Sequence, residues 1–354
     1  MLLYQVKGPV LSTCFNTEKG VGQIMNDRKI ARALRIFALA CIAVTSVCVL
    51  IYGFKTGFGL SDLIAHTDST NAVSEGSYSY DLEEEVSSLR EIDIDWVSGP
   101  VTLYYYDGST VYTTETSDRE LSGTERLEME ISGSKLSIDW DSSAVSLTIG
   151  RVRPKTLEVW IPRAFSEQID SLSIGTVSGD ITIDGISALN SRYKTTSGRI
   201  SLRNISGDEL RASTVSGDIS CENISCTEAV TASTTSGSVE LIEVYGDGLL
   251  LDTTSGSMSF SGTADNITCR SVSGSVDITA SSWPSSAVMH SVSGNISMHM
   301  PEAGSGFTCT FSSVSGDFSS AFDTVKDGKA HIFGDGSSVL EVETTSAGFE
   351  LLKN

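Results

Sequence analysis

Residues 176–183 read TVSGDITI, and the pattern returns at 195–202 as TTSGRISL and at 214–221 as TVSGDISC. Five further copies follow, at residues 234–241, 253–260, 271–278, 291–298 and 313–320. Their glycines are separated by 18 to 22 residues and are Gly179, Gly198, Gly217, Gly237, Gly256, Gly274, Gly294 and Gly316. A period of this length indicates a repeat architecture, in which each unit completes its core by stacking on its neighbours.

Apolar residues stand two and four positions after these glycines, as Ile181 and Ile183 do in the first copy. Because side chains alternate across a β-strand, we expect these positions, the glycine, and the valine or threonine two positions before it to share one buried face. A second apolar pair precedes the glycine by seven and five positions, as Leu172 and Ile174 do. Each repeat is therefore predicted to hold two or three short strands with one buried face.

A single repeat cannot bury such a face, whereas identical repeats stacked about 4.8 Å apart can. The sequence thus predicts an all-β fold, namely a β-solenoid (β-helix) of about eight rungs, where each rung is one repeat of 19–20 residues. A β-sandwich or an antiparallel β-prism built from the same repeat is the alternative.

Short alternating segments also precede the repeats. They lie at residues 92–97, 101–106, 127–131, 136–140 and 157–161. Alternation of this kind is typical of half-buried strands. We therefore expect an irregular N-terminal β region at residues 91–165, followed by the β-solenoid repeat domain at residues 166–354. Residues 55–90 are polar and aperiodic, which is typical of a stalk or linker.

Residues 36–54 read IFALACIAVTSVCVLIYGF and carry no charge. A helix of this length can span a hydrocarbon core of about 30 Å. Basic residues precede the segment and acidic residues dominate after it, so the positive-inside rule places the N-terminus in the cytoplasm. Residues 1–35 then form a cytoplasmic tail. An alternative is that translation starts at Met25, in which case residues 1–24 are a mis-assigned start. A cleaved signal peptide is the alternative, although its apolar stretch is usually only about 7–15 residues long.

The charge distribution excludes some classes of protein. The chain has 24 basic and 45 acidic residues, a net charge of −21 at pH 7. Nucleic acid is excluded as a partner, because phosphate binding needs a basic surface. The chain has only four histidines, and it contains no nucleophile, phosphate-loop or zinc-binding motif. We therefore expect a protein that is not an enzyme, with no catalytic, cofactor-binding or metal-binding residues and no cofactor.

Two sequence features resemble binding sites but have a simpler interpretation. The first feature is the set Asp180, Arg199 and Asp218, which directly follow successive repeat glycines. These residues could form a face that binds a ligand or calcium, but the interpretation that we favour is an exposed charge ladder. The Gly-Asp-Gly runs at 246–248 and 334–336 resemble calcium-binding loops. They lack the repeated nonapeptide of calcium-binding solenoids, so we interpret them as turns.

The cysteines and asparagines of the repeats also have structural interpretations. Cys221 and Cys269 fall in predicted core columns and are expected to act as small buried apolar residues. A disulfide between Cys221 and Cys226, across a corner of the rung, is the alternative for that pair. The pattern for N-glycosylation occurs at Asn204, Asn223, Asn266 and Asn295. In this context we interpret them as turn asparagines that precede an inward isoleucine.

From about residue 92 to the C-terminus, the chain combines alternating segments, a hydrophobic strand that ends in Pro162, and serial SGD-like repeats. In this it resembles a bacterial β-strand-repeat family of unknown function that is labelled "putative adhesin". The resemblance covers about 260 residues and also includes the preceding membrane anchor. It implies a location in the cell envelope, with envelope-stress responses for some members.

We therefore expect a membrane-anchored extracytoplasmic surface protein, adhesin-like, that presents a rigid β-repeat domain for binding in the cell envelope. Its partners would be the lipid bilayer, through residues 36–54, and an envelope polymer or protein. It would cross the bacterial cytoplasmic membrane once, with the N-terminus inside and the C-terminal domain outside. The alternative is an envelope-stress sensing or regulatory membrane protein, and a polysaccharide-active enzyme is the third hypothesis.

Overall fold

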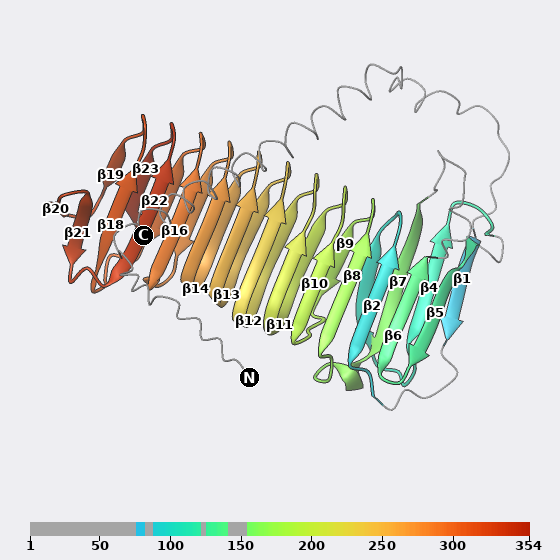
Figure 1. Ribbon diagram of the computed structural model, residues 1–354. Coiled ribbons are helices and arrows are strands. Elements are labelled where there is room, and N and C mark those ends of the chain that lie inside the picture. Colours follow the sequence, from blue (N-terminus) through green and yellow to red (C-terminus); the bar gives the residue numbers. More distant parts are fainter. Residues whose placement is uncertain (1–75, 82–87, 122–124, 141–153) are drawn as a thin grey trace, which may run out of the picture. The chain divides into compact units, whose positions relative to one another are not determined.

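From β8 (Ser171–Thr176) to β17 (Ile296–Met300) the chain coils, and successive turns of the coil pair in parallel with one another (Figure 1). The computed structural model describes residues 76–81, 88–121, 125–140 and 154–354. Within them the complete elements are β-strands and one turn of 3-10 helix, η4 (Arg163–Phe165), which confirms the all-β prediction.

The strands are β1 (Gly76–Asp81), β2 (Glu91–Trp96), β3 (Val101–Tyr106), β4 (Tyr112–Ser117), β5 (Leu127–Ser132), β6 (Lys135–Trp140), β7 (Lys155–Pro162), β8 (Ser171–Thr176), β9 (Ile181–Asp184), β10 (Asn190–Lys194), β11 (Ile200–Ser213), β12 (Ile219–Thr234), β13 (Val239–Thr253), β14 (Met258–Ser271), β15 (Val276–Ala280), β16 (Ser286–Ser291), β17 (Ile296–Met300), β18 (Gly306–Ser312), β19 (Phe318–Ser320), β20 (Val325–Asp327), β21 (Ala330–Gly334), β22 (Ser338–Thr344) and β23 (Phe349–Lys353).

Two ladders of parallel strands enclose the core of this stack. In the first ladder the strands follow the repeat glycines, and Ile219 in β12 lies between Ile200 in β11 and Val239 in β13. In the second ladder the strands precede the glycines, as β8, β10 and the second half of β11 do. Neighbouring repeats are therefore parallel and in register. This confirms the stacking that the repeat predicts and differs from the antiparallel pairing of a β-prism.

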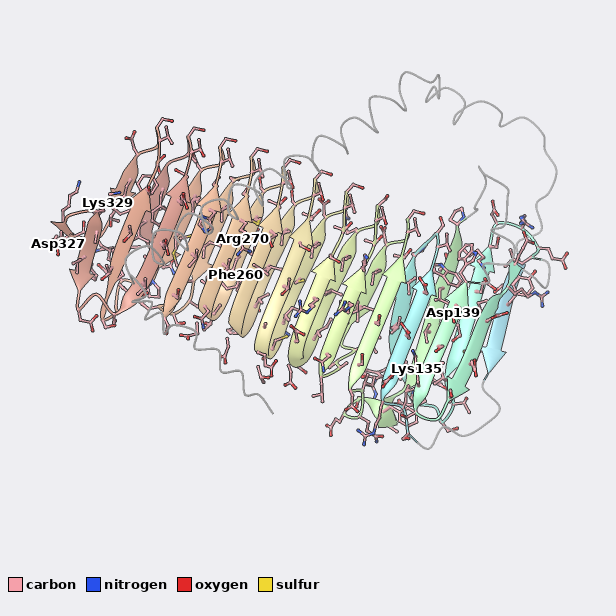
Figure 2. All side chains as sticks on the ribbon, in the orientation of Figure 1. Lys135, Asp139, Phe260, Arg270, Asp327 and Lys329 are labelled. Atoms are coloured by element: carbon pink, nitrogen blue, oxygen red, sulfur yellow. The ribbon has the colours of Figure 1, made fainter. Side chains whose placement is uncertain are left out.

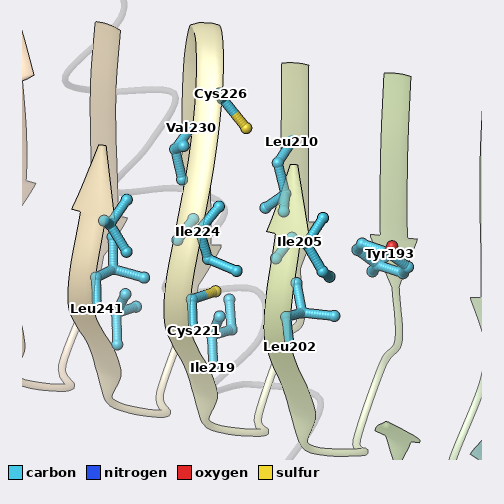
Figure 3. Packing of buried hydrophobic residues seen from close by; sticks show 14 of the residues in the cluster. Tyr193, Leu202, Ile205, Leu210, Ile219, Cys221, Ile224, Cys226, Val230 and Leu241 are labelled. Atoms are coloured by element: carbon cyan, nitrogen blue, oxygen red, sulfur yellow. The ribbon is translucent and has the colours of Figure 1, made fainter. Parts of the chain in front are cut away.

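The predicted apolar columns line the space between the two ladders. Leu202, Ile219 and Cys221 come from the first ladder, and Leu210 and Val230 from the second (Figure 3). Each of the five side chains is at most 1 % exposed. Burying one large apolar side chain of this kind contributes roughly 1.5–3 kcal/mol relative to its exposure. A continuous core thus holds the rungs together along the stack.

A tight turn joins the two ladders, from a threonine or serine to the glycine three positions later. At Gly217, the hydroxyl of Thr214 accepts a hydrogen bond from the glycine N–H (3.1 Å) and donates one to the carbonyl of Gly198 in the previous rung (3.3 Å). A Cβ atom on Gly217 would lie 1.8 Å from that carbonyl oxygen, and the equivalent distances at the other repeat glycines run from 1.6 to 2.0 Å. At these eight positions glycine is required, because the rungs meet backbone to backbone at this turn, the Thr–Gly corner.

The prediction for the residue two positions before the glycine is wrong, because these side chains face solvent. Val177, Val215, Val272 and Val292 are 46–53 % exposed, and Val314 is 85 % exposed. The alternation of the strand stops at the Thr–Gly corner, since the threonine turns inward to bind the glycine N–H. The exposed residues form a ridge along the corner, the valine–threonine ridge. It consists of Val177, Thr196, Val215, Thr235, Thr254, Val272, Val292, Thr345 and Val314.

The order of the rungs in space differs from their order in the sequence at both ends of the stack. β2 and β3 pair with β8 and β9, and β6 and β7 lie beyond them. At the other end, β22 and β23 insert between the rung of β16 and β17 and the rung of β18 and β19 (Figure 1). The region expected at residues 91–165 therefore shares one stack with the repeats, and rungs that the repeat pattern did not reveal lie at Gly99 and Ala347.

Two of the four asparagines interpreted as turn residues lie at a second corner, where the first ladder ends. Asn204 and Asn223 have φ angles of 54° and 55°, in the left-handed region that asparagine tolerates. The Nδ2 atom of Asn223 donates to Oδ1 of Asn204, and that of Asn204 donates to Oδ1 of Asp184, at 2.7 Å each. The turn interpretation is confirmed for this pair. Asn266 instead lies inside β14, and Asn295 directly follows a repeat glycine.

The expectations for the N-terminal part of the chain lie outside the described residues. They comprise the cytoplasmic tail (1–35), the transmembrane helix (36–54) and most of the stalk (55–90). The last part of that stalk contains β1, so it is not wholly irregular. Within the ranges that the structure describes, no helix is long and apolar enough to cross a membrane.

Replacing Gly217 by alanine should destabilise the middle of the stack, because the new Cβ atom would collide with the carbonyl of Gly198. Overpacking of a well-packed site costs about 1–3 kcal/mol, and here the neighbour is backbone, which cannot rotate away. Limited proteolysis of the full chain should then reveal new cleavage near residues 198–237. Gly246→Ala is the matched control, since the nearest atom to its added Cβ is 3.5 Å away. Equal protease resistance of the two variants would contradict the role of the Thr–Gly corner.

Candidate functional site

The charged residues that follow the repeat glycines interact with one another on the outer face of the first ladder. Oδ1 of Asp180 accepts a hydrogen bond from the backbone N–H of Arg199 (2.7 Å), and Oδ1 of Asp218 accepts one from that of Ser238 (2.9 Å). A guanidinium nitrogen of Arg199 lies 3.6 Å from Oδ2 of Asp218, and both side chains are more than half exposed. The three residues therefore form the expected charge ladder, in which each aspartate also caps the backbone of the next rung.

The two Gly-Asp-Gly runs differ from each other in structure. In the run at 334–336, Gly334 and Gly336 have φ angles of 59° and 73°, and Oδ1 of Asp335 accepts a hydrogen bond from the N–H of Ser337 (3.0 Å). This is the predicted turn. The run at 246–248 lies inside β13, so the turn interpretation is wrong there. Gly246 and Gly248 pair with Ala264 and Asn266 of β14, whereas the register with β12 shifts between Tyr245 and Gly248, so the run is an irregular part of a strand.

A groove opens on the outer face of the first ladder, near the C-terminal end of the stack. Successive rungs place Asn295, Gly348 and Asp317 in one column, so the glycine leaves a gap between two polar side chains. The groove has a volume of about 600 Å³, and its lining includes the carboxylates of Asp277, Asp317 and Glu350 together with several serine hydroxyls. We call this feature the acidic groove.

The acidic groove can bind groups that donate hydrogen bonds. Within the described part of the chain, the carboxylates of Asp317 and Glu350 have no hydrogen-bond or ion-pair partner, and Oδ1 of Asp277 lies 3.9 Å from Nε2 of His299. No lysine or arginine is among the lining residues. Carboxylates form their strongest hydrogen bonds with charged donors, so amino groups fit this groove best and hydroxyl groups next.

Metal binding has no support in the ranges that the structure describes. No group of three or more His, Cys, Asp or Glu side chains there is close enough to hold a metal ion. The three carboxylates of the acidic groove belong to different rungs, so they are spread along the stack by multiples of about 4.8 Å. They therefore suit a ligand that extends along several rungs.

A buried ion pair at the N-terminal end of the stack has no counterpart in the sequence analysis. Lys155 is 2 % exposed, and its ammonium group contacts the fully buried carboxylate of Glu115. It also donates to the carbonyl of Glu125 (2.7 Å) and lies 3.7 Å from the ring centroid of Trp140. The pair joins β4 to β7 beneath the end of the core. Its partners are protein groups, so its role is structural.

The cysteines of the described region are free and buried, so the disulfide between Cys221 and Cys226 does not form. Burial raises the pKa of Cys221, Cys269 and Cys309 to about 12, and that of Cys226 to about 11. A thiol with such a pKa carries almost no thiolate at neutral pH, and the thiolate is the reactive form. These cysteines therefore act as core residues.

Comparisons with known proteins identify a family model and several similar solved structures. The family model described as Toastrack DUF4097 matches residues 89–351. A solved structure of a putative adhesin from Parabacteroides distasonis is 11 % identical, with a TM-score of 0.48, and the match covers 79 % of this chain and 98 % of that one. A putative lipid-binding protein from the same species is 15 % identical, with a TM-score of 0.47, over 78 % and 96 % of the two chains.

A putative adhesin from Bacteroides fragilis is 11 % identical, with a TM-score of 0.42, and the match covers 80 % of this chain and 98 % of that one. None of the curated proteins matches this chain.

Thiol labelling should distinguish buried free cysteines from a disulfide. In a variant with Cys14, Cys41 and Cys48 replaced by serine, we expect a thiol reagent to modify no cysteine of the native chain at pH 7. After unfolding without reductant, all four remaining thiols should react, since each is free. Only two reactive thiols in the unfolded chain would indicate a disulfide, and rapid labelling of the native chain would contradict the burial.

Proposed function

This chain belongs to the Toastrack DUF4097 family, and we propose that it is a membrane-anchored extracytoplasmic protein that binds a component of the bacterial cell envelope in an adhesin-like manner. The observation that carries the proposal is the acidic groove on a stack whose core is fully occupied by packed side chains. In the described part of the chain, the acidic groove lies on the outer surface of this stack. A protein of this kind acts through contact, so we propose no catalytic step and no cofactor.

The stack is suited to present a surface without changing shape. Each rung is held to the next by parallel strand pairing in both ladders and by the direct backbone contact at the Thr–Gly corner. Outward side chains consequently recur at the rung spacing of about 4.8 Å along the stack. A regular surface of this kind favours an extended partner, such as an envelope polymer, over a small compact ligand.

The acidic groove supplies the contact that we propose for this polymer. Its carboxylates and hydroxyls accept hydrogen bonds, and no basic side chain of the lining competes with a cationic ligand. The exterior region is strongly acidic, which would repel polyanions and attract polymers that carry amino groups. We therefore propose an amine-bearing envelope glycan or peptide as the ligand class.

The sequence supports the location that we propose. The uncharged segment at residues 36–54 would anchor the chain in the lipid bilayer, and the basic residues before it would remain in the cytoplasm. The stack would then lie outside the cytoplasmic membrane. The basic tail also supports a second candidate function, regulation in response to envelope state. Deletion of the tail should change gene expression in that case, whereas a binding protein should keep its ligand affinity without it.

Protease added to intact cells, with the wall removed where needed, should degrade the stack and leave a membrane-bound N-terminal fragment. The exterior location makes residues 170–354 accessible, and the anchor retains what precedes them. Immunoblots with one epitope at each end of the chain provide the measurement. Protection of residues 170–354 in sealed cells, with cleavage only after lysis, would contradict the proposed topology.

Neutralising the acidic groove should weaken binding of a glucosamine oligomer to the full chain in nanodiscs. The double variant Asp317→Asn, Glu350→Gln removes two charge-assisted hydrogen-bond acceptors, each worth about 1.5–3 kcal/mol, so the affinity should fall by tenfold or more. Glu240→Gln with Glu228→Gln is the control, since it removes the same charge from exposed positions outside the groove. Equal affinities for the two double variants would contradict a role of the groove.

A further inference from the structure

The two ends of the stack are capped unequally. The last rung at each end has two strands, one in each ladder, and each of these strands can be covered by a cap strand. At the N-terminal end, the antiparallel strand β5 covers β6, and the antiparallel strand β4 covers β7. At the C-terminal end, the antiparallel strand β21 covers β18, whereas β19 pairs only with β23 among the described residues. Of the four strands in the two last rungs, β19 is therefore the one that no cap strand of the described chain covers.

The open edge of β19 keeps the hydrogen-bonding pattern of the stack. In each rung, the N–H two positions after the glycine donates to the carbonyl of the next rung, as that of Phe349 does to Asp317 (2.9 Å). Phe318 holds this position in the last rung, so its N–H points outward. Asp317 holds the position at which Asp180 and Asp218 accept the backbone N–H of the next rung. Both groups are thus ready to bind one more strand.

The same edge leaves the end of the core only partly covered. The ring of Phe318 packs on Phe349 (5.6 Å between centroids), Phe311 (6.0 Å) and the imidazole of His331 (4.5 Å), and the residue stays half-buried, whereas Phe349 in the preceding rung is fully buried. Beside it, Val314 is the most exposed large apolar residue of the described chain (85 %). Apolar surface at a sheet edge favours association with another strand.

β19 also lacks the charges that protect other edges of this protein. Edge strands commonly carry charged side chains that oppose pairing with a second molecule. The outer cap strand β5 carries Glu128 and Glu130, and β20 carries Lys326 and Asp327. The sequence of β19 is Phe-Ser-Ser, without any charge. Of these edges, β19 is the one that the sequence leaves open to pairing.

We propose that β19 pairs in antiparallel orientation with β19 of a second copy of this chain, which joins two stacks at their C-terminal ends. Every cap strand in this structure is antiparallel to the strand that it covers, and two open edges of the same kind can cover each other. A two-fold interface of this type closes on itself, so assembly ends at the dimer. This inference does not depend on the membrane anchor. Asp317 and Ser319 also line the acidic groove, so the interface adjoins the proposed ligand site, but pairing of β19 does not require the ligand.

The charge distribution favours a second copy at this end. Residues 313–334, which include β19 and the hairpin of β20 and β21, contain three acidic and two basic residues, a net charge of −1. Asp327 and Lys329 lie together on the hairpin of β20 and β21 at this end (Figure 2). Two copies can therefore approach here with little repulsion, whereas contact along the acidic sides of the stack would bring like charges together.

Cross-linking through Ser319→Cys tests the proposal. Ser319 is the middle residue of β19, so two-fold pairing places the two copies of this side chain opposite each other. Opposite Cβ atoms in an antiparallel pair lie about 4.5–5.5 Å apart, close to the reach of a disulfide. Ser259→Cys is the matched control, because it holds the same position after the glycine of an interior rung and is also exposed. Both variants carry serine at positions 14, 41 and 48.

We expect mild oxidation of the full chain in detergent to give a covalent dimer for Ser319→Cys and only monomer for Ser259→Cys. Equal yields for the two variants, or no dimer with either, would overturn the proposal. Cross-linking of Ser319→Cys in cells to a different protein, without the homodimer, would also overturn it.

A second variant tests the edge itself. By the alternation of the strand, the N–H of Ser320 points away from β23, so Ser320→Pro removes an outward donor and keeps the pairing of β19 with β23. Light scattering should find a dimer for the native full chain and a monomer for Ser320→Pro. Ser320→Ala is the control for the lost hydrogen bonds between the Ser320 hydroxyl and the backbone of Phe322, and it should remain a dimer. A monomeric native chain, or a dimer that persists in Ser320→Pro, would contradict the β19 interface.

Discussion

The whole stack depends on the backbone contact at the Thr–Gly corner. There the carbonyl oxygen of one rung lies 1.6 to 2.0 Å from the place that a Cβ atom on the glycine of the next rung would occupy. The threonine hydroxyl accepts a hydrogen bond from the glycine N–H of its own rung. In the rungs of Gly198, Gly217 and Gly237 it also donates to the glycine carbonyl of the previous rung. No side chain separates the rungs at this turn, so both ladders keep the close spacing that parallel pairing requires. The apolar columns can then stack without gaps.

The same contact decides which side chains reach solvent, and there the sequence analysis was only partly right. The columns after the glycine could be predicted, because the chain is a regular strand from Ile219 onward and alternation holds. The valine or threonine before the glycine could not, because alternation fails inside a turn whose conformation is set by a hydrogen bond to a side chain. The valine–threonine ridge is the result. Its sequence signal was the threonine three positions before the glycine, which is typical of a turn that binds its own backbone.

The order of the rungs in space could not be predicted from the sequence, for a different reason. A repeat is recognised by its spacing, and the rung at Gly99 is separated from the next by a long insertion that supplies the caps β4 and β5. The rung at Ala347 lacks the glycine and enters the stack before the rung that precedes it in sequence. The acidic groove arises from that insertion, since Gly348 falls between Asn295 and Asp317 only in three dimensions. The candidate site therefore could not be found from the spacing of the repeats. The spacing also could not show that β19 has no cap strand in the described part of the chain.

Distances between spin labels along the valine–threonine ridge test the stacking most directly. Labels would be attached to cysteines at Val177 and, in separate variants, at Val272, Thr345 or Val314, in a chain with serine at positions 14, 41 and 48. With one rung every 4.8 Å or so, double electron–electron resonance should give about 24, 34 and 38 Å between the labelled backbones. The label at Thr345 should be nearer to Val177 than the label at Val314, although it is later in the sequence. Distances that do not grow with rung number, or a label at Thr345 farther away than that at Val314, would contradict the account.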